Sequence, residues 1–151
     1  INLLYEALLH GANNEGPMDA VGRRGVNYYN ELGYVPYDVK INENAARTLE
    51  YAYDDFTIWQ LAKALKKPQA EIDLYAKRMM NYKYLFDPET KLIRSKNKDG
   101  SFQKPFNPFK WGDAFTEGNS WHYSWSVFHD VQGLIDLMGG EKMLCHVGFC
   151  F

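Results

Sequence analysis

The sequence predicts an all-α fold of antiparallel helical hairpins, with one long loop or small hairpin inserted. Apolar residues recur at steps of three and four along much of the chain, which is the period of a helix that buries one face. Two of the expected helices are joined by only a few residues, and helices connected so closely pack antiparallel. We find no strand-rich region and no internal repeat. The length of 151 residues is typical of a single domain.

The first expected element is a helix. Residues 1–10 place Leu4 and Leu8 at helical spacing. Gly11, together with Asn13 and Asn14, is expected to close this helix, because glycine and asparagine readily adopt the left-handed conformation in which many helices terminate.

A short helical turn is expected next, after a stretch punctuated by glycines. It covers residues 26–32 and is closed by Gly33. Pro36 disfavours the helical conformation at Val35. The segment Tyr34–Tyr37 should therefore be extended or turning.

The strongest local signal predicts a long helix over residues 43–66. Its apolar residues at helical spacing are Ala45, Leu49, Ala52, Phe56, Trp59 and Ala62. Asn42 is expected to cap its start, and Pro68 prevents its continuation. A second helix is expected over residues 69–84, so the two should form an antiparallel pair.

From residue 85 to residue 109 the pattern changes to turn sequences. Asp-Pro-Glu-Thr begins at Asp87 and Asn-Lys-Asp-Gly begins at Asn97, with a weakly alternating segment between them. We expect a long loop or a small hairpin here, and loops of this length in compact domains are usually functional. A last helix should be capped by Asp130 and run through Met138.

Composition excludes some classes of protein. The net charge is −2 and no long basic run occurs, so nucleic acid is not an expected partner. No window is apolar enough to cross a bilayer, so no membrane insertion is expected. Aromatic residues make up 16% of the chain. Their flat apolar faces suit the C–H faces of sugar rings, but a tyrosine-rich core explains the same excess equally well.

The densest cluster of chemically useful residues runs from residue 115 to residue 130. It contains Glu117, His122 and three aromatic side chains, Trp121, Tyr123 and Trp125. A carboxylic acid among aromatic rings would be partly desolvated and could keep a proton for a leaving oxygen. The alternative is that the two tryptophans are core residues and Glu117 caps a helix. Spacing alone gives the two interpretations even weight.

A second cluster lies on the long predicted helix, where Glu50 and Asp54 share one face and Asp55 follows. These acids could bind sugar hydroxyls or a cation, or they could form a solvated face paired with Arg47. The solvated face is favoured by spacing alone. A zinc site is rejected, because the available ligands lack compact spacing: His122, His129, Cys145, His146 and Cys150.

Three segments together resemble the glycoside hydrolase family 92 α-mannosidases. They are Tyr-Tyr-Asn-Glu-Leu-Gly-Tyr-Val-Pro from Tyr28, Thr-Leu-Glu-Tyr-Ala-Tyr-Asp-Asp from Thr48, and Glu-Gly-Asn-Ser-Trp-His-Tyr-Ser-Trp from Glu117. The resemblance implies that residues 1–142 are part of an (α/α)6 toroid, the catalytic domain of an exo-acting, inverting α-mannosidase. Residues 143–151 depart from the family, as a truncation or a shifted reading frame would.

The resemblance also implies roles for residues. Glu117 matches the family's general acid, and the expected sugar contacts are Trp121, Tyr123, Trp125, Glu50, Asp54 and Asp55. The family is calcium-dependent, but its base and calcium motifs lie downstream of the segments matched here. We therefore expect this chain to bind no calcium and to be inactive alone.

Mannose-containing glycans are the partners that the resemblance implies, and a secreted, periplasmic or cell-surface location is implied as well. The alternative is a noncatalytic module that binds carbohydrate or associates with itself through exposed apolar helix faces, as a homo-oligomer.

Overall fold

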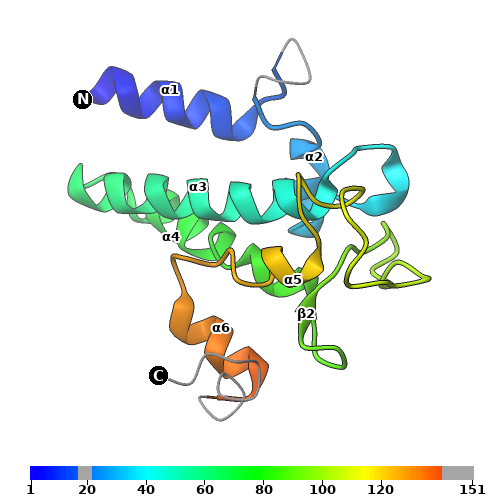
Figure 1. Ribbon diagram of the computed structural model, residues 1–151. Coiled ribbons are helices and arrows are strands. Elements are labelled where there is room, and N and C mark those ends of the chain that lie inside the picture. The colour runs from blue at the N-terminus through cyan, green and yellow to red at the C-terminus, as the bar shows by residue number, and fades with distance from the viewer. Residues whose placement is uncertain (17–21, 141–151) are drawn as a thin grey trace.

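The computed structural model describes residues 1–16 and 22–140 (Figure 1). The described part is mainly helical, as the sequence predicts, with one two-stranded antiparallel hairpin. The α-helices are α1 (Asn2–Asn13), α2 (Val26–Leu32), α3 (Asn44–Ala64), α4 (Gln69–Arg78), α5 (Ser120–Tyr123) and α6 (Val131–Met138). The 3-10 helices are Tyr37–Val39 and Asn81–Leu85, and the strands are β1 (Phe86–Asp87) and β2 (Leu92–Ile93).

Helix α3 is the central element, with α1 and α4 packed along it (Figure 1). Ala52 and Ala62 have no accessible surface, and such small side chains allow neighbouring helices to approach closely. One buried cluster joins the three helices: Tyr5, Ala12, Ile58, Ala62 and Tyr75. The short α3–α4 connection confirms the predicted helical pair.

A second core lies around the other half of α3. It includes Leu49 from α3, Tyr82 and Leu85 from the second 3-10 helix, and Leu134 from α6. The chain between β2 and α5 gathers at the N-terminal end of α3 (Figure 1). This loop region carries the candidate site.

Several element boundaries match the prediction and others correct it. Helix α2 covers residues 26–32 and ends at Gly33 in the left-handed conformation, as expected. The expected cap of α6 is confirmed, because the Asp130 side chain accepts a hydrogen bond from the backbone N–H of Gly133. Helix α1 ends at Asn13 with Asn14 as its C-cap, within the expected closing segment of Gly11, Asn13 and Asn14. The side-chain amide of Asn14 donates to the carbonyl of His10 at 2.8 Å, which satisfies a late carbonyl group of the helix.

The predicted second helix of the pair is shorter than expected. Helix α4 ends at Arg78, and the chain then tightens into the 3-10 helix Asn81–Leu85. Tyr82 and Leu85 lie at the i, i+3 spacing that a 3-10 helix brings onto one side, and both are fully buried. Packing against the second core therefore overrides the helical period of the sequence.

Candidate active site

The loop that carries Glu117 is bonded to the N-terminal end of α3. The backbone N–H of Glu43 donates to the carbonyl of Asp113 at 2.8 Å, and the N–H groups of Ala45 and Ala46 donate to that of Ala114 at 3.1 Å. The first N–H groups of a helix have no partner within it, so these carbonyls take the place of a side-chain cap. The prediction that Asn42 caps α3 is therefore wrong: Glu43 is the capping residue and makes no side-chain cap hydrogen bond.

The other side of the loop is held by a capping box at the start of α5. Oδ1 of Asn119 accepts from the backbone N–H of His122 at 3.2 Å, and Nδ1 of His122 accepts from the N–H of Asn119 at 3.3 Å. Each of the two residues thus satisfies a backbone donor of the other. The alternative that Glu117 is the cap of this helix is wrong, because Asn119 is the cap.

Two buried serines fasten α5 to strand β2. The Ser120 hydroxyl donates to the carbonyl of Ile93 at 2.6 Å, and the N–H of Ile93 donates to the Ser124 hydroxyl at 2.8 Å. Both backbone polar groups of the buried residue Ile93 are satisfied in this way. These two hydrogen bonds therefore fix the position of α5 relative to the hairpin.

Glu117 stands between these two anchored segments. Its φ angle is +47°, in the left-handed region that costs a non-glycine residue about 1–2 kcal/mol. Its side chain is exposed, and no residue in the described part of the chain forms a hydrogen bond or ion pair with its carboxylate. A strained residue held by its surroundings is typical of functional sites. The geometry presents an unpaired carboxylate on a fixed loop.

The three aromatic residues expected to contact sugar differ in their surroundings. Tyr123 is half-buried, donates its hydroxyl hydrogen to the carbonyl of Thr116 at 2.7 Å, and packs its ring against Phe115. Trp125 is half-buried against the second core. Trp121 is also half-buried, but its indole Nε1 is buried and has no hydrogen-bond partner in residues 1–16 and 22–140. Trp121 thus carries a buried indole donor that is left unsatisfied within the described residues.

The acids of α3 separate into exposed and buried groups. Glu50 and Asp54 are exposed at i and i+4, and partial burial together with their mutual repulsion raises the pKa of Glu50. Partial burial also raises the pKa of Asp54, although Arg23 at 3.6 Å acts in the opposite direction. Asp54 lies about 15 Å along the α3 axis from Asn44. The structure therefore does not bring the α3 acids and Glu117 into one set of contacts.

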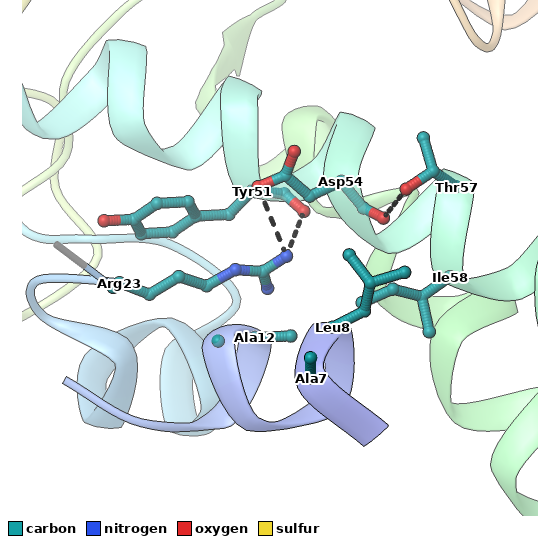
Figure 2. Close-up of a pocket in the computed structure, with 10 residues that line it drawn as sticks. Ala7, Leu8, Ala12, Arg23, Tyr51, Asp54, Thr57 and Ile58 are labelled. Atoms are coloured by element: carbon teal, nitrogen blue, oxygen red, sulfur yellow. Dashed lines mark hydrogen bonds and ion pairs between the residues drawn. The ribbon is translucent and has the colours of Figure 1, made fainter. Parts of the chain in front are cut away.

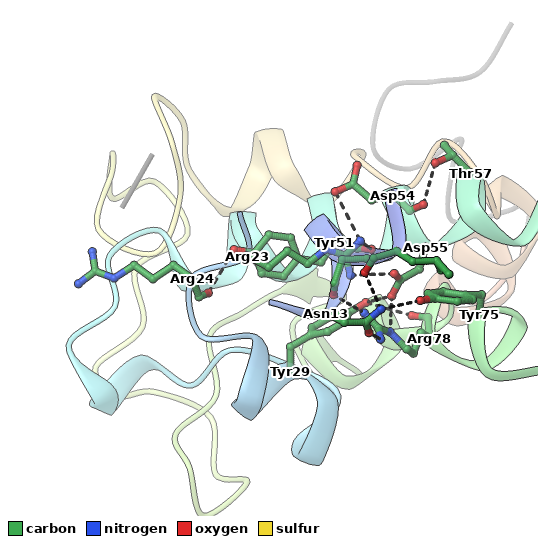
Figure 3. Close-up of polar contacts among 12 residues, drawn as sticks. Asn13, Arg23, Arg24, Tyr29, Tyr51, Asp54, Asp55, Thr57, Tyr75 and Arg78 are labelled. Carbon is green, nitrogen blue, oxygen red and sulfur yellow. Dashed lines mark hydrogen bonds and ion pairs between the residues drawn. The ribbon is translucent and has the colours of Figure 1, made fainter. Parts of the chain in front are cut away.

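Asp55 belongs to a buried network of charges (Figure 3). It has no accessible surface, and its two oxygens accept hydrogen bonds from Arg23 Nη1 at 2.7 Å and from Arg78 Nε at 2.8 Å. Tyr29 donates its hydroxyl hydrogen to Asp55 at 3.0 Å. Arg78 also reaches back to Asn13 at the end of α1. The expectation that Asp55 contacts sugar does not fit this geometry, because all of its surface is used inside the fold.

A cavity of about 320 Å³ opens between α1 and α3 (Figure 2). Ala7 and Leu8 line one wall, Ile58 lines the other, and Arg23 reaches between them (Figure 2). Its walls are largely apolar, and its α3 residues start at Tyr51, well past the end of α3 that holds the Glu117 loop. It is therefore separate from the candidate active site.

The part of the chain that the structure describes contains no cluster of the side chains that most often bind metals. In residues 1–16 and 22–140, no three His, Cys, Asp or Glu side chains come together closely enough to hold a metal ion. Cys145, His146 and Cys150 lie outside the described residues, as does the expected atypical tail, 143–151. No described helix is long and apolar enough to span a membrane.

Sequence reasoning missed two features of this site. Phe109 and Trp111 are the exposed aromatic residues of the loop, with 70% and 63% of their surfaces accessible. Two aromatic residues within a turn-rich loop are a signal that could have found them. The anchoring carbonyls of Asp113 and Ala114 are backbone groups, so no side-chain pattern could have revealed them.

An unpaired carboxylate on an anchored loop of a helical scaffold, with exposed aromatic rings on the same loop region, fits one of the two carboxyl groups that glycoside hydrolases use. The model of the glycosyl hydrolase family 92 catalytic domain matches residues 1–146. The chain belongs to glycoside hydrolase family 92.

Solved structures of this family superpose closely on the chain. A family 92 inverting mannosidase of Bacteroides thetaiotaomicron VPI-5482 is 42% identical with a TM-score of 0.89, over 94% of this chain and 19% of that one. An α-mannosidase of Bacteroides thetaiotaomicron is 37% identical with a TM-score of 0.84, over 94% and 18%. The chain therefore has the fold of the corresponding part of these family 92 mannosidases.

A curated relative is also similar. An uncharacterized secreted glycosidase of Arthroderma benhamiae is 31% identical over 93% of this chain and 22% of its own length. The chain thus spans about a fifth of the length of the proteins it matches.

Proposed function

We propose that the chain forms the acid-bearing part of an exo-acting, inverting α-mannosidase that hydrolyses terminal α-linked mannose from glycans. The observation that carries this proposal is the unpaired Glu117 carboxylate on a loop anchored at both sides. The inverting mannosidase among the similar structures supports the same reaction. A secreted or periplasmic location goes with the proposal, since one relative is named a secreted glycosidase.

In this mechanism Glu117 is the general acid. Its carboxyl group gives a proton to the glycosidic oxygen while the bond from that oxygen to the anomeric carbon breaks. A water molecule attacks the opposite face of the sugar and gives its proton to a second carboxylate, about 6.5–9.5 Å from the first. The leaving part departs as an alcohol and the anomeric configuration is inverted.

Further sugar contacts belong to the same proposal. Trp121 is half-buried and remains a candidate for contact with a sugar ring. Glu50 and Asp54 are exposed and remain candidates for contact with more distant hydroxyl groups. Asp55 is not among them, because it is buried.

The second carboxylate and the calcium ligands are expected from segments other than those described. Loss of one essential group in a catalytic unit costs several orders of magnitude in rate. The chain alone should therefore release no mannose from an α-mannoside, with or without calcium. Calcium-dependent release by the pure chain would contradict this proposal.

The role of Glu117 can be tested by placing this chain in the corresponding segment of the 42% identical mannosidase. Glu117→Gln should lower kcat by roughly 10²–10⁴ on methyl α-mannoside, whose leaving group needs a proton. On a dinitrophenyl α-mannoside, whose leaving group needs none, the loss should be far smaller. Glu89→Gln, at an exposed glutamate of the hairpin turn, is the control. Equal losses on both substrates would exclude Glu117 as the acid.

A second candidate function is self-association. Helix α1 exposes Ile1, Leu3 and Leu4 together at its start, and such apolar groups favour contact with another copy. Sedimentation over a concentration series should then show dimers that Leu3→Glu and Leu4→Glu abolish. A monomer at all concentrations would exclude this candidate.

A further inference from the structure

The exposed rings of Phe109 and Trp111 are used neither by the core nor by the proposed reaction. Their accessible fractions, 70% and 63%, are high for such large apolar side chains. Leaving them in water forgoes the favourable free energy that burial of such large apolar side chains would give. Large apolar rings that are held exposed in this way favour contact with a ligand.

The backbone that carries these rings is fixed. The side chain of Asn107 accepts from the N–H of Phe109 at 3.0 Å, and the carbonyl of Asn107 accepts from the N–H of Lys110 at 3.1 Å. The Lys110 ammonium then contacts Asp113 at 2.7 Å, and Asp113 also accepts from the Tyr37 hydroxyl at 3.1 Å. The loop therefore holds its rings in position before any ligand binds.

One backbone hydrogen bond ties this loop to the acid. The N–H of Gly112 donates to the carbonyl of Gly118 at 2.8 Å. Gly112 directly follows Trp111, and Gly118 directly follows Glu117. A side chain at Gly118 would come within 3.0 Å of the Tyr123 ring, so glycine suits this close approach. The chain at Trp111 is thus placed beside the chain at Glu117.

Both exposed rings rest on residues of α5. Phe109 stacks on Trp121 with centroids 6.3 Å apart and planes inclined by 24°, while Trp111 meets the ring of His122 edge to face at 5.7 Å. Each exposed ring is therefore supported on one side and open on another. We call Phe109, Trp111 and His122 the receiving surface.

His122 adds a directed donor to this surface. Its Nδ1 accepts the hydrogen bond from the N–H of Asn119, so the proton of the neutral ring is on Nε2. The side chain is exposed, and no described residue accepts from Nε2. The capping box therefore sets which nitrogen of His122 faces outward as a donor.

We propose that the receiving surface binds the leaving part of the glycan, the sugar ring attached to the oxygen that Glu117 protonates. This inference rests on the proposed function. A pyranose ring places its apolar C–H face on Trp111, and one of its hydroxyls accepts from His122 Nε2. The terminal mannose lies between the two carboxyl groups, so rings beside the acid are placed for the departing sugar. Trp111 and His122 would then determine which leaving sugar the enzyme accepts.

Binding is tested first with the 151-residue chain, whose four tryptophans give four indole N–H signals in an NMR titration. α-Mannobiose should move the Trp111 signal with a millimolar Kd, and methyl α-mannoside should bind more weakly. Trp111→Ala should weaken mannobiose binding about three- to tenfold, the range expected for loss of one aromatic contact. Phe128→Ala is the matched control, because Phe128 is 72% exposed but packs near Tyr53 on α3.

Equal weakening by Trp111→Ala and Phe128→Ala, or no site-specific shift at tens of millimolar sugar, would overturn the proposal. Shifts that grow with protein concentration in the absence of sugar would assign the surface to a second copy and overturn it equally.

The chimeric mannosidase separates this inference from the proposed function. Trp111→Ala should raise KM for α-mannobiose and leave kcat and the KM for methyl α-mannoside nearly unchanged. His122→Gln should keep the fold, because glutamine also completes a capping box, but should weaken mannobiose binding by displacing the donor. If Glu117→Gln leaves kcat unchanged, the proposed function is contradicted. If only Trp111→Ala leaves the KM for α-mannobiose unchanged, the proposed role of the receiving surface is contradicted and the proposed function is not.

Discussion

Arg78 donates from Nε to Oδ2 of Asp55 at 2.8 Å, and both side chains are buried. Arg23 contacts the other oxygen of the same carboxylate at 2.7 Å. One carboxylate of α3 thus connects α4 with the segment that precedes α2 (Figure 3). A buried charge is tolerated only with such partners, so the three residues depend on one another.

Replacing Asp55 should therefore be severe. Asp55→Asn leaves two buried guanidinium groups without a counter-charge, and we expect the free energy of unfolding to fall by about 3–5 kcal/mol. Urea denaturation followed by circular dichroism measures this. Asp54→Asn is the control: that side chain is 57% exposed and 3.6 Å from Arg23, so the change should stay within about 1 kcal/mol. Similar losses for both variants would contradict the structural role of Asp55.

The serine contacts to Ile93 give a second prediction. Ser124→Ala leaves the buried N–H of Ile93 without a partner, which should cost about 1–3 kcal/mol of unfolding free energy. Ser126→Ala, at a half-buried serine two positions further on, should stay within about 0.5 kcal/mol. Thermal unfolding of the two variants and the parent chain under the same conditions measures these differences in stability. A silent Ser124→Ala would show that α5 is not fastened to β2 in this way.

The backbone conformation of Glu117 gives a third prediction. At φ +47° an alanine is strained and a glycine is not. The free energy of unfolding of Glu117→Gly should therefore be roughly 0.5–1 kcal/mol larger than that of Glu117→Ala, so the glycine variant is the more stable one. At Glu89, which has no positive φ, the order of the two variants should be reversed. Chemical denaturation of the four variants measures both differences. The same order at both positions would rule out strain at Glu117.

Stability should fall in acid partly through Asp87. Burial alone would raise the pKa of Asp87, but hydrogen bonds from Arg94, Thr90 and the backbone N–H of Glu89 outweigh it and hold that pKa below its ordinary value. The folded state therefore binds the proton less readily than the unfolded state, whose pKa is about 3.9. The stabilising contribution is complete above this pH and is lost as the pH falls through the lower, folded-state value.

Urea midpoints measured from pH 6 to pH 3 test this sign. Asp87→Asn should be less stable than the parent chain at pH 6, and the gap should narrow toward pH 3. Asp73→Asn, at an exposed position of α4, is the control. The stability gap between the parent chain and Asp87→Asn should still narrow toward pH 3 when both chains carry Asp73→Asn. A gap that widens in acid would contradict the pKa direction.

The sequence by itself determined the helical class, because apolar periodicity follows directly from the need of each helix to bury one face. It also identified the short helix at residues 26–32 and the Asp130 cap, since glycine ends and carboxylate caps act locally. The order of the family motifs likewise indicated the family and Glu117.

Tertiary structure alone decided what no local pattern encodes. The α3 N-terminus is capped by backbone carbonyls of a loop about 70 residues away, and one acid of the Thr48–Asp55 motif is buried between two arginines. The backbone at Trp111 is also placed beside the backbone at Glu117 by a hydrogen bond between Gly112 and Gly118. These relationships depend on segments distant in sequence meeting in space, so neighbouring residues carry no signal of them.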